Sequence, residues 1–267
     1  EMKGVANSEV MGSSNGVIAP SIFFEKCFND EDWYVFYPLT VYKEYGVHFA
    51  DMDLDEMYEE LLANPNVRKE KCELSARELL NKIATLQIES GYPYLFYVTN
   101  ANKNHPLKRL GKVKFSNLCT EIAQLSTLSK FGDYGEEDEI GYDVQCCLSS
   151  LNIVNAVEKD NGIEKGSRVA IRMLSNVLKL TDIKNAPAIM KANRELRAVG
   201  LGVMNYTGFL FKNNIQYGSK EALAIADIFG MMMNYYTLDE SMLLAKKHSP
   251  FVGFEKSDYA DGTYFND

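Results

Sequence analysis

The sequence predicts an α/β fold, because short segments of strand length alternate with helices that carry their own start and stop signals. Tyr94–Val98 is a continuous apolar run, which is typical of a strand covered on both faces. Ser75 and Glu78 have the spacing of a capping box, and Gly91 follows where that helix should end. Signals of both kinds recur to the end of the chain.

The predicted elements follow in chain order. Residues 1–16 are polar and are predicted to form a loop or a frayed start. Helices are predicted over 20–28, between Asp53 and Pro65, between Ser75 and Gly91, and over 167–180, 187–198, 206–214 and 219–247. Strands are predicted over 33–37, 94–98, 144–154 and 200–204. We interpret 100–106 as a polar turn, 112–121 as an extended segment, and the acidic run 136–139 as a solvated loop rather than a metal site.

The composition limits the possible functions. A chain of 267 residues is long enough for one large domain or two small ones. Its net charge of -9 argues against general nucleic-acid binding, although a pocket for a single nucleotide is compatible with it. No apolar stretch resembles a signal peptide or a membrane span. Five cysteines without a Cys-x-x-Cys spacing indicate free thiols in a reducing cytoplasm.

The segment 116–121, Ser-Asn-Leu-Cys-Thr-Glu, carries the most reactive set of side chains. Alternate side chains of an extended backbone project to one side, so Asn117, Cys119 and Glu121 are expected to face the same way. A thiol between a hydrogen-bonding amide and a possible general base is a reactive constellation. From these residues alone, a small buried hydrophobic role for Cys119 remains the simpler interpretation.

Other motifs are weaker. The Gly200-x-Gly202 pair lacks the third glycine of a dinucleotide fingerprint and indicates close backbone packing. The three histidines are isolated and have no zinc-like spacing. Cys146 and Cys147 are adjacent, and neighbouring cysteines rarely bond to each other because the ring is strained. In a strand they would face opposite sides.

Three segments together resemble the catalytic α subunit of class I ribonucleotide reductases. They are Phe115–Ile122, Asp143–Asn152 and Arg197–Asn205, and Cys146 follows Cys119 by 27 positions. The stretches 33–46, 90–94 and 253–262 are similar to the class Ib branch. The resemblance runs in the same order from about residue 20 to the end of the chain.

The resemblance implies part of a ten-stranded α/β barrel, with Cys119 on a loop inside it. Cys119 would become a thiyl radical and abstract the 3′ hydrogen of a ribonucleoside diphosphate. Glu121 would take the 3′-hydroxyl proton, and Asn117 would hydrogen-bond the ribose hydroxyls, so both would bind substrate. Cys146 would be one half of the redox-active dithiol that reduces the 2′ position. A Cys119 thiol on the outer surface would argue against this assignment.

The chain departs from the family pattern in two positions and in length. The family usually has asparagine at the position of Cys147 and glycine at that of Ser149. We expect residues 1–267 to form a single partial catalytic barrel domain, without the family's N-terminal effector-binding part and its C-terminal part. The dNTP and ATP effectors would bind those absent regions, and no cofactor or metal is expected on this chain.

Half a barrel would expose strand edges and apolar surface, so partners are expected. They would be one or more complementary α-subunit fragments, a metal-containing β subunit that generates the radical, and a thioredoxin- or glutaredoxin-type reductant, with no nucleic acid and no membrane. The working hypothesis is one piece of a split or truncated α subunit, acting in the cytoplasm of a bacterium or of a phage's host. One alternative is a non-catalytic remnant or paralogue that binds and modulates a host reductase. A glycyl-radical relative is a weaker alternative, because no glycyl-radical loop is visible in these residues.

Overall fold

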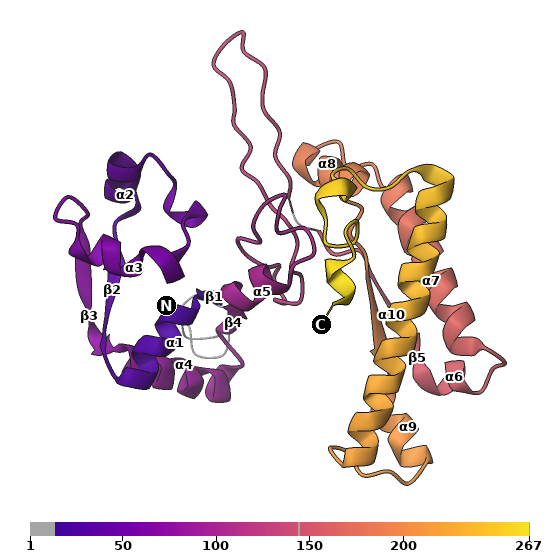
Figure 1. The fold of residues 1–267 in the computed structure, drawn as a ribbon. Helices are drawn as coiled ribbons and strands as arrows, with labels where there is room; N and C mark the ends of the chain where they lie inside the picture. The colour runs from indigo at the N-terminus through magenta and orange to yellow at the C-terminus, as the bar shows by residue number, and fades with distance from the viewer. Residues whose placement is uncertain (1–13, 144, 267) are drawn as a thin grey trace. The chain divides into compact units, whose positions relative to one another are not determined.

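The computed structural model describes residues 14–143 and 145–266. Their contacts divide the chain into two compact units. Unit 1 extends to Ser126 and also includes the residues from Lys256 onward, and unit 2 comprises Thr127–Glu255. Helices alternate with strands in both units, which confirms the predicted α/β class (Figure 1). The single-domain interpretation stays a prediction, because two compact units can belong to one domain.

Unit 1 contains most of the strands. Among its described residues the α-helices and strands are β1 (Gly16–Ala19), α1 (Ser21–Asn29), β2 (Asp32–Phe36), α2 (Pro38–Tyr45), α3 (Leu54–Ala63), β3 (Lys69–Ser75), α4 (Ala76–Ser90), β4 (Tyr94–Tyr97) and α5 (Val98–Asn104). Short 3-10 turns occur at Phe49–Asp51 and Thr263–Phe265, and a third, Phe254–Lys256, spans the boundary between the units.

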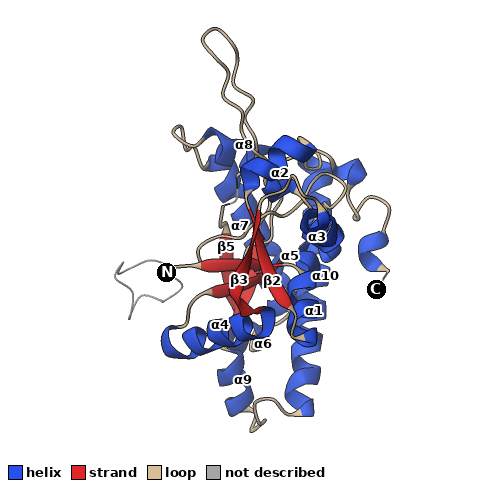
Figure 2. Cartoon of the chain, turned by 90° about the vertical axis from the view of Figure 1, so that its left-hand side faces the viewer, coloured by secondary structure: helices blue, strands red, loops and turns tan. Residues whose placement is uncertain are grey.

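The strands of unit 1 form two separate pairs. β1 lies parallel to β4, with Gly16 opposite Tyr94 and Ala19 opposite Tyr97. β2 and β3 are antiparallel (Figure 2). β3 ends at Ser75, whose hydroxyl accepts from the Glu78 amide at 3.2 Å, while its own amide donates to the Glu78 carboxylate at 2.9 Å. The predicted capping box therefore forms and starts α4 directly from the strand.

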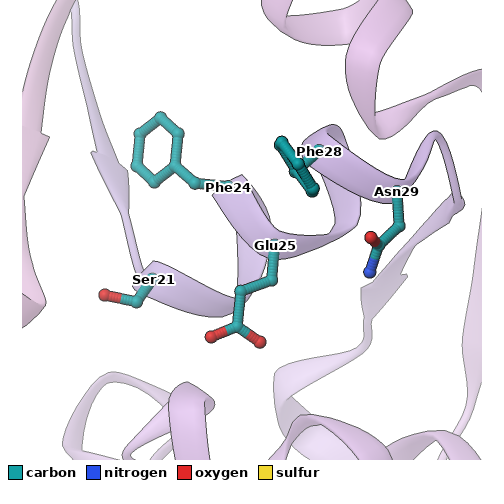
Figure 3. Close-up of a pocket in the computed structure, with 5 residues that line it drawn as sticks. All are labelled: Ser21, Phe24, Glu25, Phe28 and Asn29. Atoms are coloured by element: carbon teal, nitrogen blue, oxygen red, sulfur yellow. The ribbon is translucent and has the colours of Figure 1, made fainter.

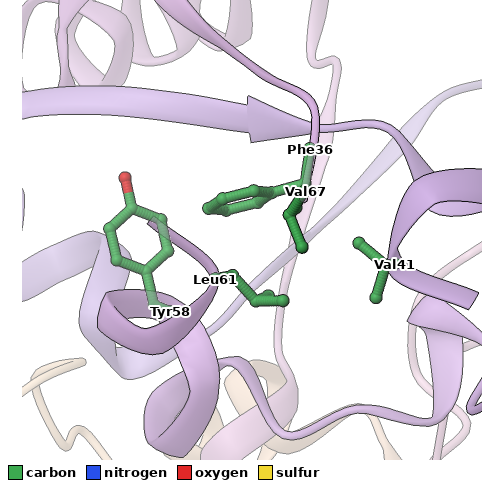
Figure 4. Packing of buried hydrophobic residues seen from close by; sticks show 5 residues of the cluster. All are labelled: Phe36, Val41, Tyr58, Leu61 and Val67. Atoms are coloured by element: carbon green, nitrogen blue, oxygen red, sulfur yellow. The ribbon is translucent and has the colours of Figure 1, made fainter. Parts of the chain in front are cut away.

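The core of unit 1 centres on an aromatic and aliphatic cluster. It comprises Phe36, Val41, Tyr58, Leu61 and Val67, all almost fully buried (Figure 4). Burying each of these side chains contributes roughly 1.5–3 kcal/mol. The Tyr58 hydroxyl accepts a hydrogen bond from the backbone amide of Tyr34 at 3.0 Å, so its polar end is satisfied inside the core. This cluster fixes α3 against the β2–β3 pair.

Unit 2 is built around one parallel strand pair and a long helix. Its elements are β5 (Leu148–Asn152), α6 (Ile153–Val157), α7 (Gly162–Leu180), α8 (Pro187–Glu195), β6 (Gly200–Met204), α9 (Tyr206–Lys212) and α10 (Lys220–His248). β5 and β6 pair in register from Leu148 opposite Gly200 to Asn152 opposite Met204. α7 packs against α10 (Figure 1).

Ion pairs reinforce the contact between α7 and α10. Glu240, which is 3% exposed, accepts from Arg172 at 2.6 and 3.0 Å. Arg168 bonds to Asp239 at 2.6 Å and to Glu164 of its own helix at 3.0 Å. A buried carboxylate held by a two-point guanidinium contact fixes the register of the two helices.

Several elements differ from the sequence prediction. β1, α2 and β3 were not predicted, and α5 replaces the polar turn expected at 100–106. α2 begins with Pro38 at its first position, where a missing amide has no cost, so the residue directly after the predicted strand 33–37 starts a helix. Of the strand expected at 144–154, Val144 lies outside the described residues, and the strand runs only over Leu148–Asn152. The chain enters α6 at Ile153, because the Asn152 side chain caps that helix.

The described strands form three two-stranded sheets and do not close a barrel. The acidic run 136–139 lies on an exposed arm, in which Lys130 and Glu139 form an isolated antiparallel bridge. The interpretation of that run as a solvated loop agrees with its exposure.

Candidate active site around Cys119

Cys119 lies in a tight turn of unit 1. The amide of Thr120 donates to the carbonyl of Asn117 at 3.1 Å, and Thr120 has a φ of 65°, in the left-handed region. The Asn117 side-chain oxygen accepts from the Ile122 amide at 3.1 Å, while the Ser116 hydroxyl donates to the Ile122 carbonyl at 2.6 Å. Residues before and after the thiol are thus joined across the turn.

This geometry corrects one sequence expectation. The segment was predicted to be extended, with Asn117, Cys119 and Glu121 on one side by simple alternation. The structure has a turn at Leu118 and Cys119, so alternation does not set their directions. The Asn117 side chain instead bonds within the turn and helps to shape the loop that carries the thiol.

Buried anchors hold both sides of the turn. Val113, which is 1% exposed, is clamped by Asn102 of α5: its amide donates to the Asn102 side-chain oxygen at 2.8 Å and its carbonyl accepts from the side-chain nitrogen at 2.9 Å. Ile122 and Leu125 are buried on the other side of the turn. Lys112 pairs with Asp53 at 3.1 Å. These contacts fix where the segment passes over unit 1.

Two tyrosines lie close to the turn. Tyr92 and Tyr94 flank Pro93 at the start of β4, and their ring centroids are 4.9 Å apart. The pKa of Tyr94 is raised first by its hydrogen bond to Tyr92, and further by the nearby charges of Cys119 and Glu121. The Cys119 thiol and the Glu121 carboxylate are therefore both within electrostatic range of the Tyr94 phenol, at the start of β4.

The sequence analysis did not assign a role to Asn102, Tyr92 or Tyr94. Tyr92 lay in a segment noted only for its resemblance to the class Ib branch, and Tyr94 was also placed at the start of a predicted strand. Asn102 was placed in a polar turn, and nothing in its local sequence indicates that it bonds a backbone eleven residues ahead. Such contacts depend on tertiary structure and have no local signal.

The Cys119 thiol is exposed, which by itself argues against the assignment made from the resemblance. The sequence predicted a loop inside a barrel; the loop is present, but in this chain it is open to solvent. The physical reason is that the described strands form separate pairs, so they provide no closed wall around the turn. A reactive thiol in this position needs further protein surface to exclude water.

Cys146 and Cys147 lie in unit 2 and differ in exposure. Cys146 is exposed, whereas Cys147 is buried against Leu174, Leu178 and Val199. The Cys147 thiol contacts the Leu174 carbonyl at 3.7 Å, and burial raises the pKa of this thiol. Cys147 therefore behaves as a small core residue, and Cys146 is the member of the pair that reagents can reach.

The two best-defined depressions among the described residues are lined by residues other than these cysteines. One open depression of about 540 Å³ lies on α1 and is lined by Ser21, Phe24, Glu25, Phe28 and Asn29 (Figure 3). A second, of about 440 Å³, lies beside α8. In the part of the chain that the structure describes, no three histidine, cysteine or acidic side chains are grouped so as to hold a metal ion. None of its helices combines the length and apolar character needed to cross a membrane.

Comparison with known proteins identifies the family of this chain. The family model described as ribonucleotide reductase, barrel domain, matches residues 2–267, so the chain belongs to that family. It is 48% identical to the ribonucleoside-diphosphate reductase subunit alpha of Bacillus subtilis over 254 residues, which are 95% of this chain and 36% of the relative. It is 38% identical to the subunit alpha of Mycoplasma pneumoniae, over 95% of this chain and 34% of the relative. The nrdEB subunit alpha of Bacillus phage SPbeta is 36% identical over 86% of this chain and 20% of its own length.

The chain thus spans about a third of the length of the bacterial relatives named above. Membership confirms the fold class as that of the reductase barrel domain, while the barrel is not closed by the strands described here.

Proposed function

We propose that this chain is part of a catalytic α subunit that reduces ribonucleoside diphosphates to deoxyribonucleoside diphosphates. The grouping of Asn117, Cys119 and Glu121 in one short turn, within a chain of this family, carries the proposal. The overall reaction consumes one ribonucleotide and two thiols and releases one deoxyribonucleotide, one disulfide and water.

Each residue of the turn has a separate role in this proposal. Cys119, as a thiyl radical, takes the 3′ hydrogen atom from the ribose and becomes a thiol, and it returns that hydrogen atom once the 2′ position is reduced, which regenerates the radical. Glu121 accepts the proton of the 3′ hydroxyl, which helps the 2′ hydroxyl to leave as water. The oxygen of Asn117 already holds the Ile122 amide at 3.1 Å, so its amide nitrogen is the group that would donate to the ribose hydroxyls.

Cys146 supplies one of the two reducing thiols. It loses a proton and an electron as the 2′ position is reduced, and it pairs in a disulfide with a second cysteine from a different segment. Its neighbour Cys147 is a poor candidate for that partner, because its sulfur is buried among Leu174, Leu178 and Val199. A thioredoxin- or glutaredoxin-type protein then reduces the disulfide.

Complementary α-subunit segments are part of this proposal. A thiyl radical reacts with unwanted donors unless water is excluded, and the exposed Cys119 turn lacks such a cover in this chain. Those segments would supply the missing wall and the effector sites, and a metal-containing β subunit would supply the oxidising equivalent. We place the assembly in the cytoplasm, where reductants keep the five cysteines available as thiols.

Reconstitution tests the proposal. The chain is mixed with the two flanking parts of the Bacillus subtilis subunit, its β subunit, thioredoxin and cytidine diphosphate, and deoxycytidine diphosphate is measured. Cys119→Ser should abolish turnover without changing the circular dichroism spectrum, and Cys146→Ser should abolish multiple turnover. Undiminished product from Cys119→Ser would exclude the thiyl role. An assembled complex that never forms product with the unsubstituted chain would favour the modulatory alternative.

A further inference from the structure

α10 is apolar on two opposite sides. Its inner side carries Ala222, Phe229 and Met233, which are buried in the core of unit 2. Its outer side carries large apolar residues that stay in solvent: Ile228, Met231, Tyr235 and Met242 are 48%, 66%, 64% and 47% exposed. A surface helix of a globular protein ordinarily presents polar residues on the side away from the core. The outer side of α10 therefore has the composition of a helix face that is buried against another element, although it is exposed in this chain.

The spacing of these outer residues is regular. They follow one another at intervals of three, four and seven, and Leu238 fills the position between Tyr235 and Met242. These are the a and d positions of a heptad repeat, extended at both ends by Ala224 and Ala245. We call Ile228, Met231, Tyr235, Leu238 and Met242 the outer seam. Apolar residues spaced by 3.5 on average fit the grooves of one further helix, crossing at about 20°.

The net charge of the chain argues against a second copy as the partner of the outer seam. Two copies of this chain each carry a net charge of -9, which opposes their association. The Bacillus subtilis relative, by contrast, has 64% of its length outside the matched part, because that part covers 36% of it.

We infer that the outer seam of α10 is the docking surface for an amphipathic helix carried by a complementary α-subunit polypeptide. The inference rests on the proposed function, since it names where the complementary chain binds. Two methionines in the seam let it adapt to the shape of a partner helix, because their side chains are unbranched and flexible. The docking helix buries side chains that are otherwise exposed along more than two turns of α10.

A paired substitution tests the docking surface. Met231→Glu places a charge in the middle of the seam, while Leu223→Glu places the same charge on the same helix at a residue that is 61% exposed but outside the seam. Binding of the full chain to the two flanking parts of the Bacillus subtilis subunit is measured by calorimetry. Met231→Glu should weaken binding at least tenfold and Leu223→Glu less than twofold, with circular dichroism unchanged for both.

A photocrosslinker at position 231, compared with one at position 223, identifies what covers the seam. Cross-links from position 231 to a helix of a flanking polypeptide support the inference. Equal weakening by both substitutions, or cross-links only to a second copy or to the same chain, would overturn it. Binding and turnover are measured separately. If the complex forms through the outer seam but yields no product, the proposed function is wrong and the docking surface stands. If the complex is active and Met231→Glu does not weaken it, the docking surface is wrong and the proposed function stands.

Discussion

Replacing Asn117 by alanine should open the Cys119 turn while unit 1 stays folded. The substitution removes the oxygen that accepts from the Ile122 amide at 3.1 Å, and Ile122 is only 7% exposed. A buried donor left without its acceptor costs about 1–3 kcal/mol. Thr120 adds to the tendency to open, because its left-handed φ of 65° is unfavourable for a β-branched residue. The closed turn should therefore lose most of its local stability.

Amide hydrogen exchange measures this opening directly. A loss of 1–3 kcal/mol corresponds to roughly 5- to 150-fold faster exchange of the Ile122 amide. Amides in the Tyr58 and Leu61 core should not change, because they lie in a separate cluster. Asn117→Asp keeps an oxygen acceptor and should leave the exchange of Ile122 near its original rate. Unchanged exchange in Asn117→Ala, or an equal increase in both variants, would refute the idea that this side chain holds the turn.

The remaining predictions concern thiol reactivity, helix capping and acid stability. Under native conditions iodoacetamide should modify the exposed Cys119 and Cys146 quickly and Cys147 slowly, because burial hides the Cys147 thiol and raises its pKa. Equal modification rates of Cys146 and Cys147, measured by mass spectrometry, would contradict this. Ser75→Ala should lower the stability of unit 1 by about 1 kcal/mol in urea unfolding, because α4 loses its capping box, whereas Ser75→Thr should lose little. Hydrogen bonds from Arg172 hold the pKa of Glu240 below its usual range, so its contribution to stability is present above pH 4 to 5 and is lost as the pH falls through the folded pKa. Glu240→Gln should thus be less stable than the original chain at pH 7, and urea midpoints that still differ equally at pH 3 would count against this reasoning.

Local signals predicted the helices of this fold better than its strands. The capping box at Ser75 and the proline after Ala186 mark helix starts. These signals are local, because the residues involved bond or pack within one helical turn. β3, by contrast, has the sequence Lys-Glu-Lys-Cys-Glu-Leu-Ser, which carries little apolar alternation, and it forms because β2 offers it an antiparallel partner. β1 likewise depends on β4, a strand more than seventy residues ahead. Pairing over that distance leaves no trace in a short window of sequence.

The composition of the candidate site was predictable, but its conformation was not. Asn117, Cys119 and Glu121 stood out because an amide, a thiol and a carboxylate occur within five residues. Their arrangement depends on the left-handed conformation of Thr120, which a β-branched residue does not favour. The turn is imposed by bonds to Ile122 and by anchors such as Asn102. Sequence could therefore name the reacting groups, while tertiary contacts decide how they are presented.

The exposed thiol and the apolar outer seam of α10 have one physical explanation. Radical chemistry requires a site closed against water, and a helix with two apolar sides requires a cover on each. Among its described residues this chain satisfies neither requirement, since Cys119 is exposed and Met231 is 66% exposed. If complementary segments supply both covers, assembly must come before radical transfer. Oxidising equivalents delivered to the chain without those segments should then be lost from Cys119 to solvent or other thiols, without product. The same chain assembled through its outer seam should keep the radical at Cys119 long enough to form deoxyribonucleotide.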